Sequence, residues 1–320
     1  MTRLEAAGFL QAHDNYLILT HTRPDGDTLG SAALLCRGLR QLGKTAHLLQ
    51  NPETTPKYTD LVEGLTIPVI PRLQSSRGNP FPEPPTVIAV DVASEGMLQK
   101  NFSGSIHLRI DHHRTGSEFS QESLVDPVAA ACGQLIYDLL TDLGVALDEP
   151  MAIALYTAIS TDTGCFRFAN TQSHTLEVAA KCAEVITDLY SLNQQLFGLV
   201  SLTKLKLQSW LLEHAIFLQN NQVAICPLPL EVERQLGITE DDTENLSGYP
   251  RSIEGVKIAA TLRETGDGQV KISLRAVPDY DAGAICAKLG GGGHRGAAGA
   301  SVTMTLEEAT QALIAALPEL

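Results

Sequence analysis

The first half of the chain alternates short apolar runs with stretches of helical periodicity. Four apolar runs predict β-strands, at residues 15–21, 44–50, 86–94 and 105–113. Helical patterns follow at residues 25–43, 127–144, 148–164 and 173–187. Strands that are apolar throughout and separated by helices are typical of a parallel sheet buried on both faces. We therefore predict an α/β domain in which helices cover both faces of a parallel sheet.

The last hundred residues show a different pattern. Antiparallel strands are predicted at residues 221–229, 252–265 and 268–277, followed by helices at 281–289 and 305–320. The tetrapeptide Thr265–Gly268 supplies a hairpin turn between two of these strands. This pattern predicts a smaller α+β domain. We place the first domain at residues 1–188, a helical connector at 189–215 and the second domain at 216–320, with a proline-rich surface loop at Pro68–Pro85.

Composition narrows the classes of partner. The chain has 320 residues, 44% of them apolar, and no apolar run approaches the roughly 20 residues needed to cross a bilayer. The N-terminus lacks the apolar segment of a signal peptide, so we expect a cytoplasmic protein with no membrane partner. A net charge of −14 argues against long nucleic acid, whose binding proteins usually present a basic face. A short anion in a local basic pocket remains compatible with this charge.

The first predicted strand ends in one histidine and two aspartates, in the stretch "HTRPDGDTLGS". Side chains of this kind repel one another and resist burial, whereas a cation among them would stabilise the cluster. Imidazole and carboxylate ligands together suit manganese, iron or zinc better than calcium. The alternative is a helix-capping turn, in which Asp27 caps the following helix and His21 is an ordinary strand-end residue.

Three further features fall at corresponding positions. Asp91 ends the third predicted strand, Asp111–His113 ends the fourth, and Asp162 follows a helix. Each has a plain structural alternative, because strand-end aspartates often cap helices and a histidine pair can be solvated. Ligands of parallel sheets bind beyond the carboxyl ends of the strands. We therefore predict that these residues and the first cluster form one site.

The second domain offers candidates for binding an anion. Four glycines precede His294 and Arg295 in "GGGGHRGAAG", and the backbone N–H groups at Gly292 and Gly293 could cradle a phosphate. The alternative is a hinge or a helix C-cap. Arg275, at a predicted strand end, could bind a terminal phosphate bidentately, or be an exposed edge cation. In the first domain, Arg114 is a weaker candidate of the same kind.

The motifs "HTRPDGDTLGS", "AVDVAS", "IDHH" and "STDTGCFRF" together resemble the four motifs of the DHH phosphoesterase superfamily. "GGGGHRGAAG" resembles the signature of its DHH-associated C-terminal domain. The resemblance covers nearly the whole chain. The length, "TDTGCFRFANT" and "KISLRA" are similar to the nanoRNase and pAp-phosphatase branch, and no extra sensory or transmembrane segment is present.

The resemblance implies two divalent metal ions, usually Mn²⁺, with Mg²⁺ or Co²⁺ as alternatives. It implies that one ion is held by His21, Asp25 and Asp91, and the other by Asp27, Asp91, His112 and Asp162. His113 would stabilise the phosphoryl charge or protonate the leaving group, and Asp111 would orient a histidine. His294, Arg295 and Arg275 would contact substrate phosphate.

The implied activity is metal-dependent hydrolysis of short RNA or DNA oligonucleotides, of linear dinucleotides such as pGpG and pApA, and of the 3′-phosphate of pAp. We expect the active site between the two domains, with hinge motion through the connector. The alternatives are a single-strand exonuclease of the same superfamily and a non-catalytic nucleotide sensor. A family II pyrophosphatase fits poorly, because its second domain lacks the glycine-rich signature. The resemblance is compatible with a homodimer, and the sequence does not decide between monomer and dimer.

Overall fold

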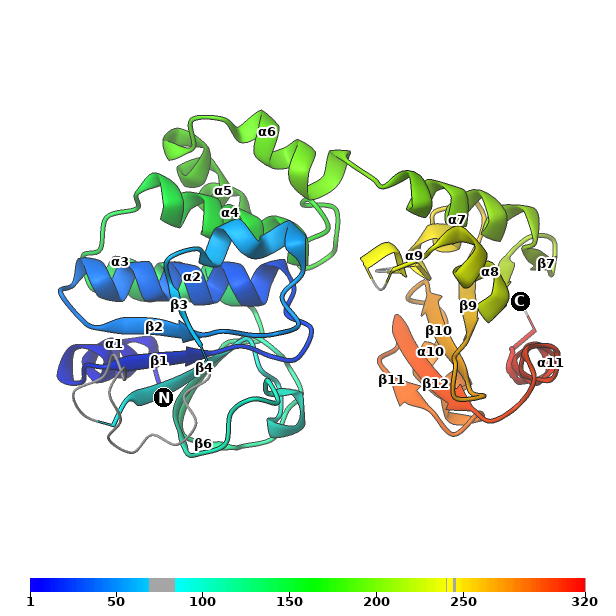
Figure 1. Ribbon diagram of the computed structural model, residues 1–320, viewed down its shortest axis with the longest axis horizontal. Helices are drawn as coiled ribbons and strands as arrows, with labels where there is room; N and C mark the ends of the chain where they lie inside the picture. The colour runs from blue at the N-terminus through cyan, green and yellow to red at the C-terminus, as the bar shows by residue number, and fades with distance from the viewer. Residues whose placement is uncertain (69–83, 240, 244–245, 320) are drawn as a thin grey trace. The chain divides into compact units, whose positions relative to one another are not determined.

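The computed structural model describes residues 1–68, 84–239, 241–243 and 246–319 (Figure 1). The predicted loop at Pro68–Pro85 therefore falls largely outside the described residues. The chain divides into two compact units, Met1–Leu199 and Val200–Leu320. The point of division lies within the stretch predicted as the connector. No helix among the described residues has both the length and the apolar character needed to cross a membrane.

The first unit contains a six-stranded sheet with the order β3-β2-β1-β4-β5-β6. Its elements are α1 (Arg3–Ala12), β1 (Tyr16–Leu19), α2 (Gly26–Gln41), β2 (Ala46–Leu49), η1 (Pro56–Val62), β3 (Thr66–Ile67), β4 (Thr86–Val90), η2 (Glu95–Met97), β5 (Ile106–Asp111), β6 (Ser120–Val125), α3 (Cys132–Asp142), α4 (Glu149–Asp162), α5 (Ser173–Val185), α6 (Leu189–Asn193) and the π-helix η3 (Gln194–Gly198). Every neighbouring pair of strands is parallel, which confirms the predicted sheet. The elements α1, β3 and β6 were not predicted.

The strand order reverses between β1 and β4. From β1 the chain proceeds outward to β2 and β3, and then returns to build β4, β5 and β6 on the other side of β1. At such a reversal the following segments diverge and leave a crevice beyond the carboxyl ends of the two central strands. The strand order therefore predicts a ligand site beyond the carboxyl ends of β1 and β4.

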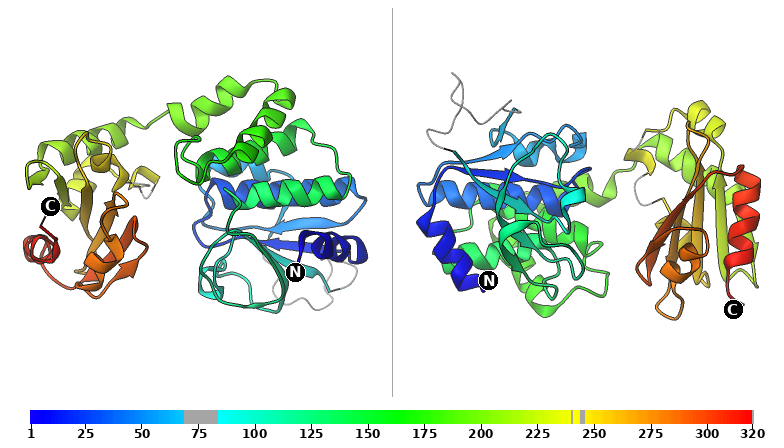
Figure 2. Two further views of the ribbon diagram at one scale, coloured as in Figure 1. Left: turned by 180° about the vertical axis from the view of Figure 1, so that it is seen from behind. Right: turned by 90° about the horizontal axis from the view of Figure 1, so that it is seen from below.

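Different parts of the chain cover the two faces of the sheet. On one face, Ile18 belongs to a core that includes residues of α1 to α5. On the other face, Leu17 packs with Phe102 and Phe119, which lie in loops. Among the described residues, the long helices gather on the first face (Figures 1 and 2), and loop residues that include Leu98, Phe102 and Phe119 pack on the second. Burial on both faces explains why the central strands β1 and β4 are almost entirely apolar.

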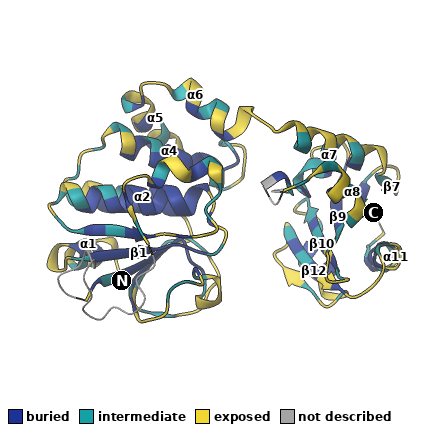
Figure 3. Cartoon of the chain, in the orientation of Figure 1, coloured by how far each residue is buried: buried dark blue, intermediate teal, exposed yellow. Residues whose placement is uncertain are grey.

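Helix α2 is buried along nearly its whole length and packs closely against α4 (Figure 3). A Cβ at Gly30 would lie 2.4 Å from the carbonyl oxygen of Ala154, and one at Gly26 would lie 2.5 Å from Oγ1 of Thr161. Only glycine permits this approach. The start of α2 is thereby held against the end of α4, at the carboxyl edge of the sheet.

The second unit is a mixed sheet with helices, in the strand order β11-β12-β10-β9-β8-β7. Its elements are α7 (Leu202–Glu213), β7 (Ile216–Leu218), β8 (Val223–Leu228), α8 (Leu230–Leu236), η4 (Asp241–Thr243), α9 (Gly248–Arg251), β9 (Ile258–Glu264), β10 (Val270–Ala276), α10 (Ala282–Ala287), β11 (Gly292–Gly293), β12 (Ala297–Val302) and α11 (Leu306–Ala316). The predicted antiparallel arrangement is wrong for β8 and β9, which pair in parallel. The predicted hairpin between β9 and β10 is confirmed. Helix α7 packs Leu207 and Leu211 against this sheet.

Candidate active site

Acidic and histidine side chains gather at the carboxyl edge of the first sheet, where the strand order reverses. His21 follows β1, Asp91 follows β4, and His112 follows β5. Helices supply the rest, because α2 starts and α4 ends at the same edge. The six residues brought together are His21, Asp25, Asp27, Asp91, His112 and Asp162. Asp162 is the last residue of α4 rather than a residue beyond it.

The first set comprises His21, Asp25 and Asp91. The Nδ1 atom of His21 hydrogen-bonds the carbonyl oxygen of Thr22 at 2.7 Å, which leaves Nε2 directed at the carboxylates. This Nε2 lies 3.8 Å from Oδ1 of Asp25 and 3.7 Å from Oδ2 of Asp91. The imidazole thus presents a lone pair toward two carboxylate oxygens.

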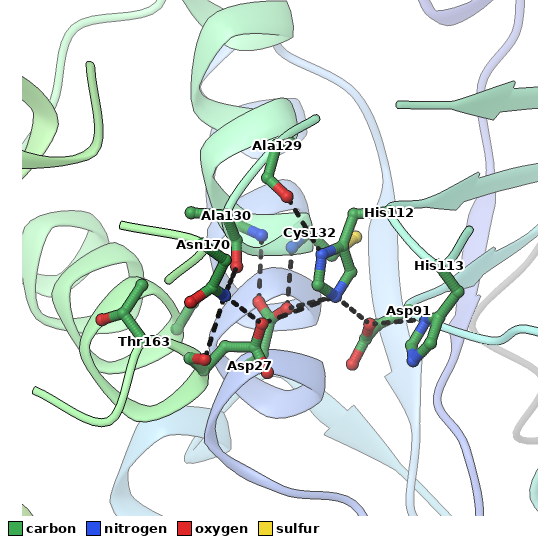
Figure 4. Close-up of polar contacts among 12 residues, drawn as sticks. Asp27, Asp91, His112, His113, Ala129, Ala130, Cys132, Thr163 and Asn170 are labelled. Atoms are coloured by element: carbon green, nitrogen blue, oxygen red, sulfur yellow. Dashed lines mark hydrogen bonds and ion pairs between the residues drawn. The ribbon is translucent and has the colours of Figure 1, made fainter. Parts of the chain in front are cut away.

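The second set comprises Asp27, His112 and Asp162. Asp91 is again adjacent to His112 (Figure 4). The Nδ1 atom of His112 hydrogen-bonds the carbonyl oxygen of Ala129 at 3.2 Å. Its Nε2 atom lies 3.6 Å from Oδ2 of Asp27 and 3.7 Å from Oδ2 of Asp162. The same atom lies 3.5 Å from Oδ1 of Asp91. Asp91 therefore faces both histidines, one through each oxygen.

The two aspartates of the first motif have different capping roles. Asp25 is the N-cap of α2 and accepts the backbone N–H of Thr28 at 3.0 Å. Asp27 accepts the backbone N–H groups of Cys132 at 2.7 Å and Gly133 at 3.0 Å, at the start of α3. The alternative in which Asp27 caps α2 is therefore wrong. The N-terminal dipole of α3 helps to hold the Asp27 carboxylate in a buried position.

Asp91 is held in an unusual conformation. Its φ is +57°, in the left-handed region, and the residue is only 2% exposed. Its Oδ2 accepts the hydroxyl of Thr28 at 2.6 Å, but its buried Oδ1 has no hydrogen-bond partner among the described residues. A buried carboxylate oxygen without a donor is costly unless a cation satisfies it.

The carboxylates perturb one another. Burial, followed by repulsion from Asp27 and Asp25, raises the pKa of Asp91 well above its usual range. Burial also raises the pKa of Asp27. Burial together with repulsion from Asp27 raises the pKa of Asp162 to about 7. Positive charge at this edge would oppose all three effects.

These residues fit divalent cations. The histidine-to-carboxylate separations of 3.5–3.8 Å are too long for hydrogen bonds. Ligand atoms that share one cation at about 2.1 Å lie roughly 3–4 Å from one another. Imidazole and carboxylate donors are also the combination that transition-metal ions accept. A cation bound among these donors would also interact with Oδ1 of Asp91, the oxygen that has no hydrogen-bond donor among the described residues.

His113 lies at the border of the cluster. Its Nδ1 hydrogen-bonds Oδ1 of Asp111 at 2.7 Å, and its side chain is 39% exposed. Burial alone would raise the pKa of Asp111, but the hydrogen bonds from His113 and the positive charge of both neighbouring histidines together outweigh burial and lower that pKa. The same hydrogen bond raises the pKa of His113. His113 can also be grouped with Asp91 and His112, but its Nδ1 is engaged by Asp111, so its Nε2 is the atom free to meet a substrate. Arg114 follows as an exposed residue.

Comparison with known families agrees with the motifs. Residues 15–159 match the DHH family, N-terminal domain, and residues 220–320 match the DHHA1 domain. The chain belongs to the DHH family. The resemblance found in the motifs is thus confirmed, and the two matches are here called the DHH and DHHA1 domains.

Relatives and solved structures resemble this DHH protein over nearly its full length. It is 32% identical over 303 residues to the bifunctional oligoribonuclease and PAP phosphatase NrnA of Thermus thermophilus, covering 94% of this chain and 89% of that one. It is 27% identical over 300 residues to the protein of the same name from Bacillus subtilis, covering 92% and 91%. An exopolyphosphatase-related protein from Bacteroides fragilis shares the fold with a TM-score of 0.81 at 20% identity, covering 98% of this chain and 94% of that one.

The DHHA1 domain brings its predicted anion-binding residues to one end of its sheet. Arg275 on β10 pairs with Ala297 on β12, and a tight turn joins His294 to Ala297. The Arg275 guanidinium is half-buried and donates a hydrogen bond to the neighbouring carbonyl of Leu274, at 3.2 Å. Arg295 is exposed and donates Nε–H to the carbonyl of Pro278 at 2.7 Å. No carboxylate lies within ion-pair distance of Arg275 in the described parts of the chain.

The four glycines before His294 differ in what their surroundings require. Gly290 has φ +76° and follows the end of α10, and a Cβ at Gly291 would lie 2.2 Å from the carbonyl oxygen of Gly299. Gly293 has φ +146°. A Cβ at Gly292 would meet nothing within 4 Å, and the residue is exposed. The helix-cap alternative thus explains Gly290, but it does not explain Gly292.

Several residues that support the cluster were not predicted. Thr28 and Ser31 hydrogen-bond Asp91 and Asp27 through their hydroxyls. Ser31 stands four positions after Asp27, so helical periodicity could have placed it on the same face. Asn51 and Asn170 also contact the cluster, and no local pattern distinguishes them from loop asparagines.

Proposed function

We propose that the protein is a metal-dependent phosphoesterase that hydrolyses short oligonucleotides and linear dinucleotides and removes the 3′-phosphate of pAp. The observation that carries the proposal is the convergence of His21, Asp25 and Asp91 with Asp27, His112 and Asp162 around the orphaned oxygen of Asp91. The relatives named bifunctional oligoribonuclease and PAP phosphatase support this substrate class. The net charge of −14 favours short substrates over long nucleic acid.

We assign the six clustered residues to two cation sites, with Asp91 shared, and Mn²⁺ as the expected ion, with Mg²⁺ or Co²⁺ as alternatives. Bound divalent cations would supply Lewis acidity toward phosphoryl oxygens and activate a water at neutral pH. The protein's contribution is the placement of the donors. Nδ1 hydrogen bonds fix both ligand histidines with Nε2 toward the carboxylates, and Thr28 fixes the orientation of Asp91.

His113 is assigned to the substrate. Asp111 holds its Nδ1, so a proton on Nε2 can be directed at a phosphoryl oxygen or at the leaving oxygen. Arg114 is placed to contribute positive charge beside it. In the DHHA1 domain we assign Arg275, Gly292, Gly293, His294 and Arg295 to binding of substrate phosphate. Support comes from the half-buried guanidinium of Arg275, which has no carboxylate partner among the described residues, and from the unobstructed Gly292.

The test is a parallel comparison of kcat/KM. Purified Mn²⁺-loaded protein is given pAp, pGpG, a 5-mer RNA, a 24-mer DNA and pyrophosphate. We expect the first three to be hydrolysed in preference to the others. Preference for the 24-mer would support a single-strand exonuclease, and tight nucleotide binding without turnover would support a sensor. Either result would refute the proposal.

Two variants control this comparison. Asp91→Asn keeps the size of the side chain and should abolish turnover. Asp242→Asn changes another buried carboxylate, which accepts hydrogen bonds from Ser201 and Thr239 in the second unit. This variant should leave turnover near that of the wild type. Equal activity of the two variants would exclude the clustered carboxylates as the centre of the reaction.

A further inference from the structure

Asn170 joins the two sides of the second set. Its Nδ2 donates to the carbonyl oxygen of Ala130 at 2.9 Å and to that of Asp162 at 3.2 Å (Figure 4). The same nitrogen lies 3.5 Å from Oδ2 of Asp162. The amide group of one side chain therefore ties the end of α4 to the segment that leads into α3.

That segment, Ala129–Gly133, holds the other two members of the set. The carbonyl of Ala129 accepts the His112 ring nitrogen, and the N–H groups of Cys132 and Gly133 hold Asp27. His112, Asp27 and Asp162 come from three different elements. The hydrogen bonds of Asn170 connect the segment that holds His112 and Asp27 to Asp162 itself.

The backbone between α4 and Asn170 is strained, and this strained turn directs the chain back toward the site. Gly164, Cys165 and Phe166 have φ values of +57°, +57° and +62°, one left-handed turn directly after α4. Two of these residues carry side chains, and each costs about 1–2 kcal/mol in this conformation. Strain of this kind persists where the surrounding structure requires it. Here the turn reverses the chain so that Asn170 lies beside Asp162.

Asn51 has the corresponding place in the first set. Its Nδ2 donates to the carbonyl oxygen of His21 at 2.8 Å and to Oγ1 of Thr20 at 2.9 Å. Its Oδ1 accepts the backbone N–H of Glu53 at 3.0 Å, and the residue is 7% exposed. Asn51 thus connects the segment after β2 to His21, the proposed metal ligand that follows β1. None of these three hydrogen bonds involves a residue of the second set.

We infer that Asn170 and Asn51 are positioning residues, one for each cation site, so that the two sites can be weakened separately. The inference rests on the proposed function, because it assumes that both sets bind cations. The physical reason is that ligands from separate elements must be held together before the cation arrives. Outer partners of this kind typically contribute about 10–100-fold to metal affinity.

The experiment measures Mn²⁺ binding by isothermal titration calorimetry, independently of turnover. Asn170→Leu and Asn51→Leu keep the approximate shape of asparagine and remove its amide. Each is made alone and combined with Asp162→Asn, which removes a ligand of the second set. We expect Asn170→Leu to weaken one of two binding events about 10–100-fold. In the Asp162→Asn background it should have little further effect, whereas Asn51→Leu should weaken the remaining event.

Thermal unfolding of the metal-free variants separates positioning from folding. Both leucine variants should retain a cooperative transition, and Asn170→Ser replaces Asn170→Leu if the latter does not fold. Equal weakening of both events by either variant, or no weakening by Asn170 variants that fold, would overturn the inference. Absence of Mn²⁺ binding by the wild-type protein would instead refute the proposed function, so the two failures are distinguishable.

Discussion

The close packing of α2 against α4 makes Gly30→Ala an informative perturbation. The new Cβ would lie 2.4 Å from the carbonyl oxygen of Ala154, closer than the 3.0 Å that real Cβ atoms essentially never cross. Because the obstacle is backbone, the helices must separate by at least about 0.6 Å. Alanine favours a helix by about 1 kcal/mol relative to glycine. Overpacking against a rigid neighbour costs about 1–3 kcal/mol or more, so we expect net destabilisation.

The same separation would move two of the proposed metal ligands. Helix α2 carries Asp27 and α4 carries Asp162, so a shift between the helices changes the geometry of the second set. A misplacement of about 1 Å can lower a catalysed rate about 100-fold. Gly30→Ala should therefore lower both the unfolding temperature, by up to roughly 8 °C, and kcat. A variant that lost stability and kept full kcat would show that the second set tolerates the shift.

Gly8→Ala is the matched control for this variant. Gly8 also lies inside a helix, α1, but it is exposed and a Cβ there would meet nothing within 4 Å. The helix preference then acts alone, and the unfolding temperature should rise by about 2–4 °C. Calorimetry with EDTA present measures both variants without the contribution of bound metal. Stabilisation by Gly30→Ala would refute the packing argument.

Further predictions concern metal, charge and the glycine-rich loop. Mn²⁺ at about 100 times its dissociation constant should stabilise the protein by about 2.7 kcal/mol for each occupied site relative to EDTA, seen as a higher unfolding temperature. In EDTA, Asp91→Asn should not lower the unfolding temperature, because it removes a buried carboxylate repelled by its neighbours; a clear loss would contradict the repulsion. Gly292→Ala should raise KM for pAp and leave the unfolding temperature unchanged, whereas Gly291→Ala should lower that temperature by several degrees. Arg275→Met should raise KM for pAp by more than tenfold with a smaller change in kcat, and unchanged steady-state kinetics would remove it from the site.

The sheet of the first unit could be predicted where hydrophobicity alone decides the structure. Strands β1, β2, β4 and β5 are largely buried and rich in apolar residues, so they can be recognised as strands from their sequences. Strand β6 reads "SQESLV", lies at the edge of the sheet and is mostly not buried, so it carries no such mark. The direction of β9 relative to β8 was missed for another reason. The segment between them contains α8 and α9, which is long enough for the crossover that parallel strands need.

The candidate site also contains some residues that the sequence predicts and others that it does not. Charged residues at strand ends are visible in a sequence, because strands bring their ends to one edge, and the predicted His21, Asp91 and His112 lie there together. Asn51 and Asn170 could not be identified, because each acts on a residue distant in the chain: Asn170 contacts Ala130, 40 positions away. Their roles arise from tertiary packing, which no local pattern encodes.

The left-handed backbone at Asp91 limits how this position can change over evolution. Among residues with a side chain, aspartate and asparagine adopt such a φ most readily, and glycine adopts it without strain. A descendant that loses the carboxylate at position 91 but keeps the fold is therefore expected to carry asparagine or glycine there, and not glutamine or valine.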